Sequence, residues 1–494
     1  MPLTQHAHNL KLNDPSLLRD AAYINGAWIS ATTQFAVNNP STLEVLAHVA
    51  NAGVAETQQA IDAANAAFPA WSARTGKDRA GLMRKWFDLM IAHADDLATI
   101  MTAEQGKPLA EAKGEVVYGA SFIEWFAEEA KRVAGDVMAS TWTDKRMVVL
   151  RQPVGVCAAI TPWNFPLAMI TRKVSPAIAA GCTIVIKPAE QTPLSALALA
   201  ELAQRAGIPA GVINIVTADA EQSKAVGKLL CASPVVRHLS FTGSTPVGRI
   251  LMQQSAATVK KLALELGGHA PFIVFDDADL DAAVEGALLS KFRNSGQTCV
   301  CTNRFYAHAS IYDQFVEKLA AGAKKIRLGD GFAAGISQGP MIDEQAVMKV
   351  EEHVADALSK GAQLKTGGQL QQADSLFYEP TVLSAVTPDM LIMNEETFGP
   401  VAAVVKFTTE EEVIAAANNT DFGLASYFYS RDIGRVWRVA ERLEYGMVGI
   451  NTGLISNEVA PFGGVKQSGL GREGSRYGMD EYLEMKYLCL GGIQ

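Results

Sequence analysis

The segment Val154-Gly-Val-Cys-Ala-Ala-Ile160 is a short apolar run, and three similar runs follow it at residues 183–186, 211–216 and 235–241. Their successive starts are 29, 28 and 24 residues apart, close to the ~30 residues of a βαβ unit. Because the runs are apolar rather than alternating, they predict strands covered on both faces, as in a parallel sheet. Helical patterns at 194–205 and 220–230 fall between them, giving the outline of a dinucleotide-binding domain.

A second α/β series follows, and Ala270–Pro271 is the boundary that we expect between the two. Its predicted strands are residues 271–275, 303–308, 401–407 and 447–451, and its predicted helices are 280–292 and 311–325. Upstream, amphipathic helices are expected around Ile61, Ala64, Phe68 and Trp71, and over residues 82–100 and 121–133. Two α/β domains in tandem place a cleft between them, where small-molecule sites commonly lie.

The composition excludes several classes of protein. The 494 residues are 49% hydrophobic, too apolar for a mainly disordered chain, and 43 Lys+Arg against 52 Asp+Glu give a net charge of −9, unfavourable for nucleic-acid binding. No run approaches the ~18 apolar residues of a membrane span, and residues 1–20 lack the apolar core of a secretion signal. Six cysteines without zinc spacing make no disulfide framework. We expect a soluble cytoplasmic protein with no nucleic-acid or membrane partner.

Two glycine motifs are candidates for phosphate binding. Residues 469–474 form the only strict G-x-G-x-x-G, but no strand pattern precedes it and the chain ends before a ribose-binding acid could follow. We therefore predict a loop without a phosphate role there. Residues 243–248 follow an apolar run and precede a helical pattern, so their amides could lie at a helix N-terminus, although a plain strand–helix turn would look the same.

Cys299 lies in a polar, glycine-containing turn, whereas Cys157 and Cys182 lie in apolar runs typical of packed core. A thiol nucleophile needs a base, and Glu265, followed by Leu266 and two glycines, is the candidate; the alternative is an ordinary solvated glutamate. Cys299 and Cys301 form an isolated C-x-C pair without further ligands nearby, so we expect no metal site.

Taken together, these pieces resemble the aldehyde dehydrogenase family over nearly the whole chain. Within the family the chain is most similar to bacterial succinate-semialdehyde dehydrogenases, through residues 170–173, 291–294, 299–301 and 451–456. His269 and Ala218 depart from the pattern, in which Asn or Lys and Gly respectively are usual. The family motifs are Thr161-Pro-Trp-Asn-Phe-Pro166, Lys187-Pro-Ala-Glu190, Phe241-Thr-Gly-Ser-Thr245, Glu265-Leu-Gly-Gly268, Gly296-Gln-Thr-Cys299, Glu395-Glu-Thr-Phe-Gly-Pro400 and Pro461-Phe-Gly-Gly464.

The resemblance implies an α/β fold in three parts. Residues 1–137 and 153–270 would form a Rossmann-like cofactor-binding domain, and residues 271–465 an α/β catalytic domain. Residues 138–152 and 480–494 would form a small β oligomerisation arm. Its apolar runs, 147–150 and 487–490, lie at the edges of predicted elements. Exposed edges of this kind are normally covered, and here we expect a partner chain to cover them. A homodimer or homotetramer is the expected state.

The resemblance also implies the catalytic chemistry. Cys299 would attack the aldehyde as a thiolate, and the Asn164 side-chain amide and the backbone N–H of Cys299 would hold the oxyanion. Hydride transfer would leave a thioester, and Glu265 would activate the water that hydrolyses it. The implied cofactor-binding residues are Thr161, Pro162, Trp163, Lys187, Pro188, Ala189, Glu190, Gly243, Ser244, Leu266, Glu396 and Phe398.

The expected substrate is succinic semialdehyde, whose distal carboxylate Arg172, Arg293 and Ser456 would grip in the resembled subgroup. Structural ion pairs are the alternative for the arginines, and glutaric semialdehyde or a broader range of aldehydes is the alternative substrate. A CoA-acylating enzyme or a catalytically silent relative on the same fold would be a different class. The sequence keeps Cys299, Glu265 and Asn164, which weighs against a catalytically silent relative. The presence of Glu265 favours water over CoA as the acceptor of the thioester.

The expected cofactor is NAD, with NADP or dual use as the alternative. Lys187 could donate to ribose hydroxyls or to a phosphate, whereas the Glu190 carboxylate would accept bonds from the ribose hydroxyls of NAD and repel the 2′-phosphate of NADP. Cys301 is either a spacer or the partner of Cys299 in a reversible disulfide that switches activity off.

Overall fold

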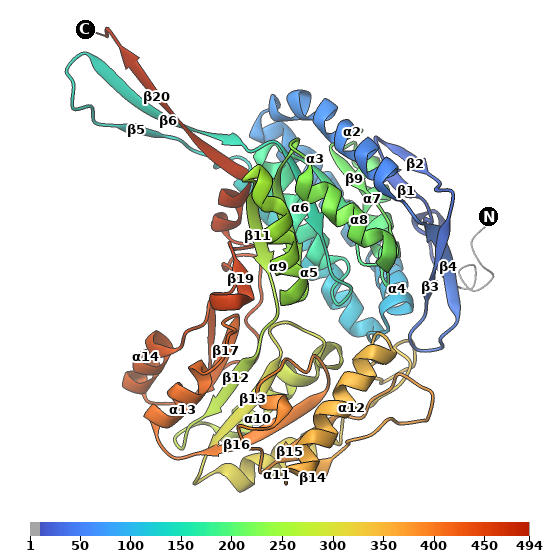
Figure 1. The fold of residues 1–494 in the computed structure, drawn as a ribbon, viewed down its shortest axis with the longest axis vertical. Helices are drawn as coiled ribbons and strands as arrows, with labels where there is room; N and C mark the ends of the chain where they lie inside the picture. Colours follow the sequence, from blue (N-terminus) through green and yellow to red (C-terminus); the bar gives the residue numbers. More distant parts are fainter. Residues whose placement is uncertain (1–9, 494) are drawn as a thin grey trace.

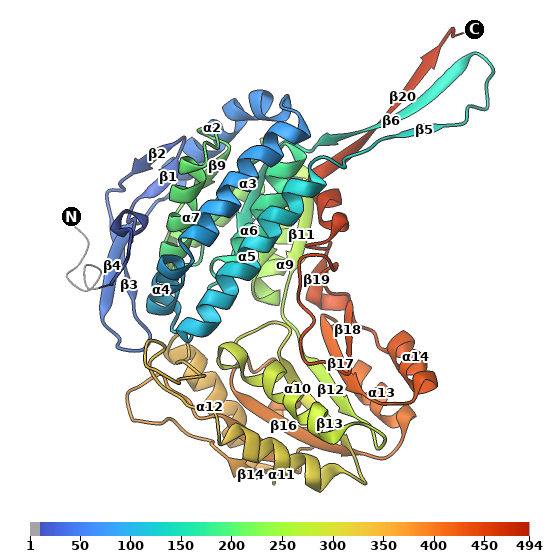
Figure 2. The same ribbon diagram turned by 180° about the vertical axis from the view of Figure 1, so that it is seen from behind.

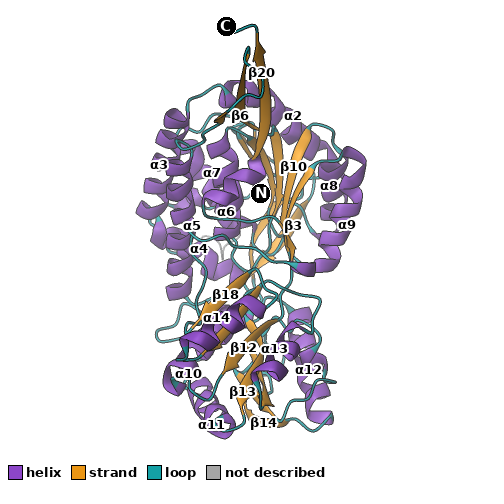
Figure 3. Ribbon diagram, turned by 90° about the vertical axis from the view of Figure 1, so that its left-hand side faces the viewer, coloured by secondary structure: helices purple, strands orange, loops and turns teal. Residues whose placement is uncertain are grey.

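Two large sheets, one in each lobe, and a thin projecting arm organise the chain (Figure 1). The computed structural model describes residues 10–493, so the first nine residues of the predicted polar N-terminus lie outside the described residues. Helices cover both faces of the sheet in each lobe (Figure 3). Within the described part of the chain, no helix is long and apolar enough to cross a membrane.

The upper sheet has eight strands in the order β19-β11-β10-β7-β8-β9-β1-β2, and five of them form a parallel core. Four strands of this core coincide with the apolar runs in the sequence, at residues 154–160, 183–186, 211–216 and 235–241. This confirms the predicted βαβ series. Its strands are β1 (Ala22–Ile24), β2 (Ala27–Ile29), β7 (Val156–Ile160), β8 (Thr183–Lys187), β9 (Ile213–Ile215), β10 (Val236–Thr242), β11 (Lys261–Glu265) and β19 (Gly469–Leu470).

The helices of this lobe lie on both faces of the sheet, with α3 and α5 across the face seen from behind in Figure 2. Two buried tryptophans fasten them, because the indole N–H of Trp71 donates to the Ile178 carbonyl and that of Trp86 to the Leu199 carbonyl. The helices are α2 (Val54–Ser72), α3 (Gly76–Ala92), α4 (Ala94–Gln105), α5 (Leu109–Glu129), α6 (Ala168–Ala180), α7 (Pro193–Arg205), α8 (Ala220–Ala232) and α9 (Thr245–Ser255).

One helix prediction was wrong in its continuity. Residues 82–100 form no single helix, because the chain breaks at His93 between α3 and α4. Asp95 and Asp96 then lie in the first turn of α4, where the helix dipole favours acidic side chains. Asp96 also accepts the backbone N–H groups of Asn13 and Asp14, a long-range contact that no local pattern reveals.

The lower lobe contains a seven-stranded sheet in the order β14-β15-β16-β13-β12-β17-β18, parallel except at β14. The chain passes from one sheet to the other between Glu265 and Ala270. Its elements are β12 (Ala270–Val274), α10 (Leu280–Phe292), β13 (Thr302–His308), α11 (Tyr312–Ala323), α12 (Glu344–Ser359), β14 (Gln363–Thr366), β15 (Thr381–Ser384), β16 (Val401–Phe407), α13 (Glu410–Asn418), β17 (Ala425–Tyr429), α14 (Ile433–Arg442) and β18 (Met447–Ile450).

A three-stranded antiparallel sheet forms the arm, whose tip carries the C-terminus (Figure 1). Its strands are β5 (Asp136–Met138), β6 (Lys145–Pro153) and β20 (Leu483–Gly491). The remaining elements are the hairpin β3 (Gln34–Asn38) and β4 (Val45–Ala50) and the short 3₁₀ turns η1 (Pro15–Leu17), η2 (Ala256–Thr258), η3 (Arg293–Gly296), η4 (Leu391–Met393), η5 (Lys466–Ser468) and η6 (Arg476–Tyr482).

Candidate active site

A cleft of about 270 Å³ lies between the carboxyl ends of the upper strands and the loops of the lower lobe. Loops that follow parallel strands gather at one edge of a sheet, which is where ligands of such folds bind. The cleft brings together nine of the site residues predicted from the sequence. These are Pro162, Trp163, Asn164, Gly243, Ser244, Leu266, Cys299, Glu396 and Phe398.

Cys299 reaches the cleft on a tight turn that follows α10. The turn needs left-handed backbone at Asn294, Ser295 and Gly296, and a Cβ on Gly296 would lie 2.3 Å from the Gly399 carbonyl oxygen. Burial raises the pKa of the Cys299 thiol to about 12, and the nearby Arg172 charge opposes that rise. The thiol is therefore protonated at neutral pH and needs a base before it can act as a nucleophile.

Asn164 lines the cleft beside Cys299 and is held on both sides. Its amide Nδ2 donates to the Gln297 carbonyl at 3.0 Å, and its Oδ1 accepts the Phe165 backbone N–H at 3.1 Å. The Asn164 backbone carbonyl accepts bonds from the side chains of Lys107 and Asn294. A primary amide carries two N–H groups, so one remains for an oxyanion after the bond to Gln297.

Glu265 ends β11 and is buried, and its Oε2 has no hydrogen-bond partner among residues 10–493. Burial holds the pKa of Glu265 well above that of an ordinary glutamate, and the neighbouring Glu473 carboxylate raises it further. Glu473 is itself buried between two cations, ion-paired with Lys173 and, at 2.9 Å, with Arg172. Those cations hold the pKa of Glu473 below its ordinary value. The result is a strong base next to a carboxylate that stays ionised.

The two arginines predicted to grip the substrate differ in their surroundings. Arg172 is buried in its ion pair with Glu473, and its guanidinium lies 4.0 Å from the ring centre of Phe462. Arg293 is half-buried with its guanidinium 5.4 Å from the Phe165 ring. Within residues 10–493 it forms no ion pair within 4 Å. Ser456 lies half-buried in the loop after β18.

A second group of predicted residues lies at the end of β8, where Lys187 and Glu190 form an ion pair at 3.1 Å. Burial lowers the pKa of Lys187. Thr161 is adjacent, since its backbone N–H donates to the Lys187 carbonyl, and Pro188 and Ala189 complete the turn. Gly243 and Ser244 stand directly before the 11-residue helix α9, with Ser244 as its N-cap, and the buried Thr242 hydroxyl beside them has no partner. This edge fits a nucleotide, because Lys187 and Glu190 at β8 can bind hydroxyls and the N-terminus of α9 can face a phosphate.

The far wall of the cleft is formed by Glu396 and Phe398. Burial raises the pKa of Glu396 to about 7, and its Oε1 accepts the Gly268 backbone N–H at 2.9 Å. A Cβ on Gly267 would lie 2.8 Å from Glu396 Oε2, so the two glycines allow this close approach. Phe398 meets Trp163 edge to face at 5.7 Å, which gives the cleft an aromatic wall.

Comparison with known proteins agrees with this geometry. The family model described as "Aldehyde dehydrogenase family" matches residues 28–488. The chain belongs to the aldehyde dehydrogenase family. It is therefore an NAD(P)-dependent oxidoreductase that acts on aldehydes.

Individual relatives are similar over their full length. A glutarate-semialdehyde dehydrogenase of Pseudomonas aeruginosa is 62% identical over 486 residues, covering 98% of this chain and 100% of that protein. The NADP(+) succinate-semialdehyde dehydrogenase of Escherichia coli is 61% identical over 484 residues, with 98% and 100% covered. The crystal structure of a succinate-semialdehyde dehydrogenase from Burkholderia pseudomallei superimposes with a TM-score of 0.96 at 64% identity, covering 97% of this chain and 100% of that one.

The two departures from the family pattern have structural explanations in this aldehyde dehydrogenase. Ala218 is fully buried and its φ is not positive, so no glycine is required there. His269 is buried, and burial holds its pKa well below the ordinary value of a histidine. Its Nε2 lies 2.9 Å from the Met393 carbonyl, so the neutral ring secures the segment that leads to Glu396.

Cys301 is buried beneath the turn that carries Cys299. Its Sγ lies 3.4 Å from the Lys291 carbonyl and 3.5 Å from the Thr302 carbonyl. Burial raises the pKa of this thiol. The switch by a Cys299–Cys301 disulfide stays a prediction.

Sequence reasoning missed several residues of the site. Lys349 of α12 and Met169 of α6 line the cleft, and nothing in their surrounding patterns marks them out. Glu473 was overlooked although it lies within the G-x-G-x-x-G of residues 469–474. The first two residues of that motif form the strand β19 instead of the predicted loop, and β19 pairs with β11 at Glu265. Glu473 follows three residues later, so the motif positions a carboxylate. An acidic residue inside a glycine-rich turn was the signal available.

Proposed function

We propose that this aldehyde dehydrogenase oxidises succinic semialdehyde to succinate, with glutaric semialdehyde as the rival substrate. The observation that carries the proposal is the cleft itself, in which Cys299 and Asn164 lie together and the Arg172 charge acts on the Cys299 thiol. The aldehydes in the names of the two relatives above also carry a carboxylate at the far end of a short chain.

In the proposed mechanism, Glu265 takes the proton of the Cys299 thiol and passes it to solvent, and the thiolate attacks the aldehyde carbon. The Asn164 side-chain amide and the Cys299 backbone N–H hold the oxyanion of the tetrahedral adduct; losing one such donor typically costs ~3–4 kcal/mol. The hydrogen bonds of Asn164 orient it for this role. Its side-chain and backbone oxygens both accept hydrogen bonds, and the bond from Nδ2 to the Gln297 carbonyl fixes the orientation of the side-chain amide. The adduct then gives up a hydride from the former aldehyde carbon as the carbonyl re-forms, and a thioester remains on Cys299.

Glu265 would then remove a proton from the water that hydrolyses the thioester. Its raised pKa suits a general base that works near neutral pH. We also propose that residues 1–137 and 153–270 form the cofactor-binding domain, residues 271–465 the catalytic domain, and residues 138–152 and 480–494 the oligomerisation arm.

When bound, the nicotinamide cofactor accepts the hydride. Lys187 and Glu190 would hold its adenosine ribose, and Gly243 and Ser244 its pyrophosphate at the N-terminus of α9. Thr161, Pro162, Trp163, Pro188, Ala189 and Leu266 would line its path. Glu396 would bind the nicotinamide ribose, and Phe398 would pack beside the ring.

We expect kcat/KM for succinic semialdehyde to exceed that for butanal by about 10² or more. A hydrogen bond to a charged group contributes ~1.5–3 kcal/mol. Butanal lacks the carboxylate, so it would leave the guanidinium charge unpaired. The measurement is nicotinamide reduction at its absorbance band, without CoA. Equal efficiency on the two aldehydes would refute the acid-selective site. Succinic and glutaric semialdehyde differ by one methylene, which is worth only ~1–3 kcal/mol, so the choice between them has to be measured. The measurement is kcat/KM for a panel of C3 to C6 semialdehydes.

For the cofactor, we propose NAD over NADP, with dual use as the alternative. The carboxylate of Glu190, paired with Lys187, would repel a 2′-phosphate. We expect the wild type to have the higher kcat/KM with NAD, and Glu190→Ser to shift the ratio toward NADP. A wild type that prefers NADP, or a ratio that the substitution leaves unchanged, would show that Glu190 is not the selector.

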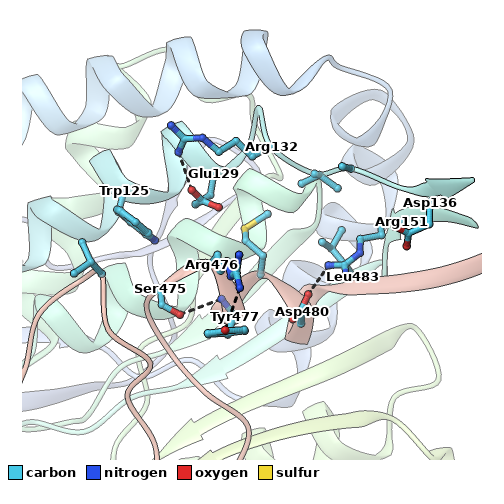
Figure 4. A pocket seen from close by; sticks show the side chains of 14 residues that line it. Trp125, Glu129, Arg132, Asp136, Arg151, Ser475, Arg476, Tyr477, Asp480 and Leu483 are labelled. Carbon is cyan, nitrogen blue, oxygen red and sulfur yellow. Dashed lines mark hydrogen bonds and ion pairs between the residues drawn. The ribbon is translucent and has the colours of Figure 1, made fainter.

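We also propose that the chain forms a homodimer or homotetramer through its arm. Both outer strands of the arm, β5 and β20, have free edges, and apolar side chains stand exposed on them, with Val137 81% and Met485 73% accessible. At the root of the arm lies a hollow of about 670 Å³ (Figure 4). Four of its charged side chains are already paired with one another, Arg151 with Asp480 and Arg132 with Glu129, which suits a packing surface better than a catalytic site.

Light scattering should therefore give a mass of at least twice 52.8 kDa. Exposed edges and apolar side chains of this extent favour association in water. Dilution into the nanomolar range distinguishes a stable oligomer from a weak one. A mass near that of the single chain at micromolar concentration would contradict the proposal.

A further inference from the structure

The hydroxyl group of Tyr118 is buried and has no hydrogen-bond partner in the part of the chain that the structure describes. Tyr118 lies in the middle of α5, and its ring meets Phe122 edge to face at 5.0 Å. Buried polar groups are nearly always satisfied in folded proteins, so an orphan hydroxyl calls for an explanation such as a missing ligand. Nothing in the mechanism above uses it.

Two contacts of α5 place this hydroxyl between the arginines of the site. In its first turn, the Glu111 carboxylate accepts the Asn294 backbone N–H at 2.9 Å, directly next to Arg293. One turn beyond Tyr118, the Phe122 ring lies 5.5 Å from the Arg172 guanidinium. Tyr118 stands between these two contacts on the helix. Its pKa agrees with this position, since burial raises it and the charges of Arg172 and Arg293 oppose the rise.

The two arginines are not equally available to a ligand. Arg172 already faces the Glu473 carboxylate and is covered by the Phe462 ring. Arg293 has the Phe165 ring and, more distantly, Glu111 as neighbours, and its guanidinium forms no ion pair within 4 Å among residues 10–493. Arg293 therefore supplies the charge that a carboxylate would meet. A carboxylate has about four acceptor sites, more than one guanidinium edge fills, and the remaining ones need a donor.

We propose that the Tyr118 hydroxyl donates a hydrogen bond to the acid group of the substrate, alongside Arg293. This inference rests on the proposed function, since it requires an aldehyde with an acid group at its far end. Tyr118 is then a specificity residue for that group, and Arg172 serves mainly to hold Glu473 next to Glu265.

The test is Tyr118→Phe, which removes only the hydroxyl. We expect kcat/KM for succinic semialdehyde to fall by about 10-fold or more, through KM, because the bond lost is to a charged group. The value for butanal should change by less than about 3-fold, because butanal makes no such bond. Succinate, used as a competitive inhibitor of butanal oxidation, should bind about 10-fold more weakly to the variant.

Tyr378→Phe is the matched control, because it removes another unpartnered hydroxyl, in a hydrophobic cluster of the lower lobe. It should leave both aldehydes and succinate unaffected. The inference is overturned if Tyr118→Phe keeps the wild-type preference and succinate affinity, or if it impairs both aldehydes equally. A wild type without any preference over butanal would instead overturn the proposed function, and the inference with it.

Discussion

Cys299→Ala should retain less than about 1% of wild-type turnover while binding the nicotinamide cofactor as the wild type does. Hydride cannot leave a planar carbonyl carbon, so the tetrahedral adduct on the thiolate is required for oxidation at all. Lys187 and Glu190, the residues proposed to hold the cofactor, lie at the end of β8, away from the turn that carries Cys299, and do not depend on its sulfur.

The measurements are steady-state turnover and cofactor titration by fluorescence on the same preparation. Cys301→Ala is the matched control, since it removes a thiol two residues away that is buried beneath the turn. We expect it to keep most of its turnover. Near-normal turnover in Cys299→Ala would remove the covalent mechanism altogether.

The parallel core of the upper sheet was predictable because its strands are buried on both faces and so are apolar in sequence. Strands β7, β8 and β10 begin within two residues of the predicted starts. Strands β1 and β2, at one end of the sheet, were not predicted, because each is three residues long and β1 joins the sheet by pairing with β9, far along the chain. Local periodicity carries no information about such partners.

The site shows the same division. Cys299, Asn164 and Glu396 occur in short motifs and were found, and they do line one cleft. Glu473 and Tyr118 act through distant neighbours. The Glu473 carboxylate meets Lys173 from 300 positions earlier, and Tyr118 is notable only because its hydroxyl is buried without a partner. Neither burial nor long-range pairing can be read from the residue itself. The ion pair of Arg172 with Glu473 was likewise not predicted, and the substrate role of Arg172 stays a prediction.

Glu265→Gln should lower turnover by about 10²–10⁴-fold, the usual contribution of a general base. The amide fills the same space at the end of β11 but cannot take a proton from water. In the wild type, activity should rise with pH as Glu265 deprotonates. Because burial and the Glu473 charge raise its pKa, that rise should fall well above the range of an ordinary carboxylate. The variant should lack this limb of the pH profile.

Glu473→Gln provides the electrostatic check on this assignment. It removes the carboxylate that raises the pKa of Glu265 and leaves the Lys173 and Arg172 charges, which lower it. The loss of the negative charge and the cations that remain both favour ionised Glu265. Its pKa should therefore fall, and the rising limb of the pH profile should move to lower pH. Because breaking a buried ion pair destabilises the fold, thermal unfolding is measured alongside. Pre-steady-state kinetics locate the step, since a burst of reduced cofactor in Glu265→Gln places the defect after hydride transfer. A pH profile that neither substitution alters would mean that Glu265 is not the base.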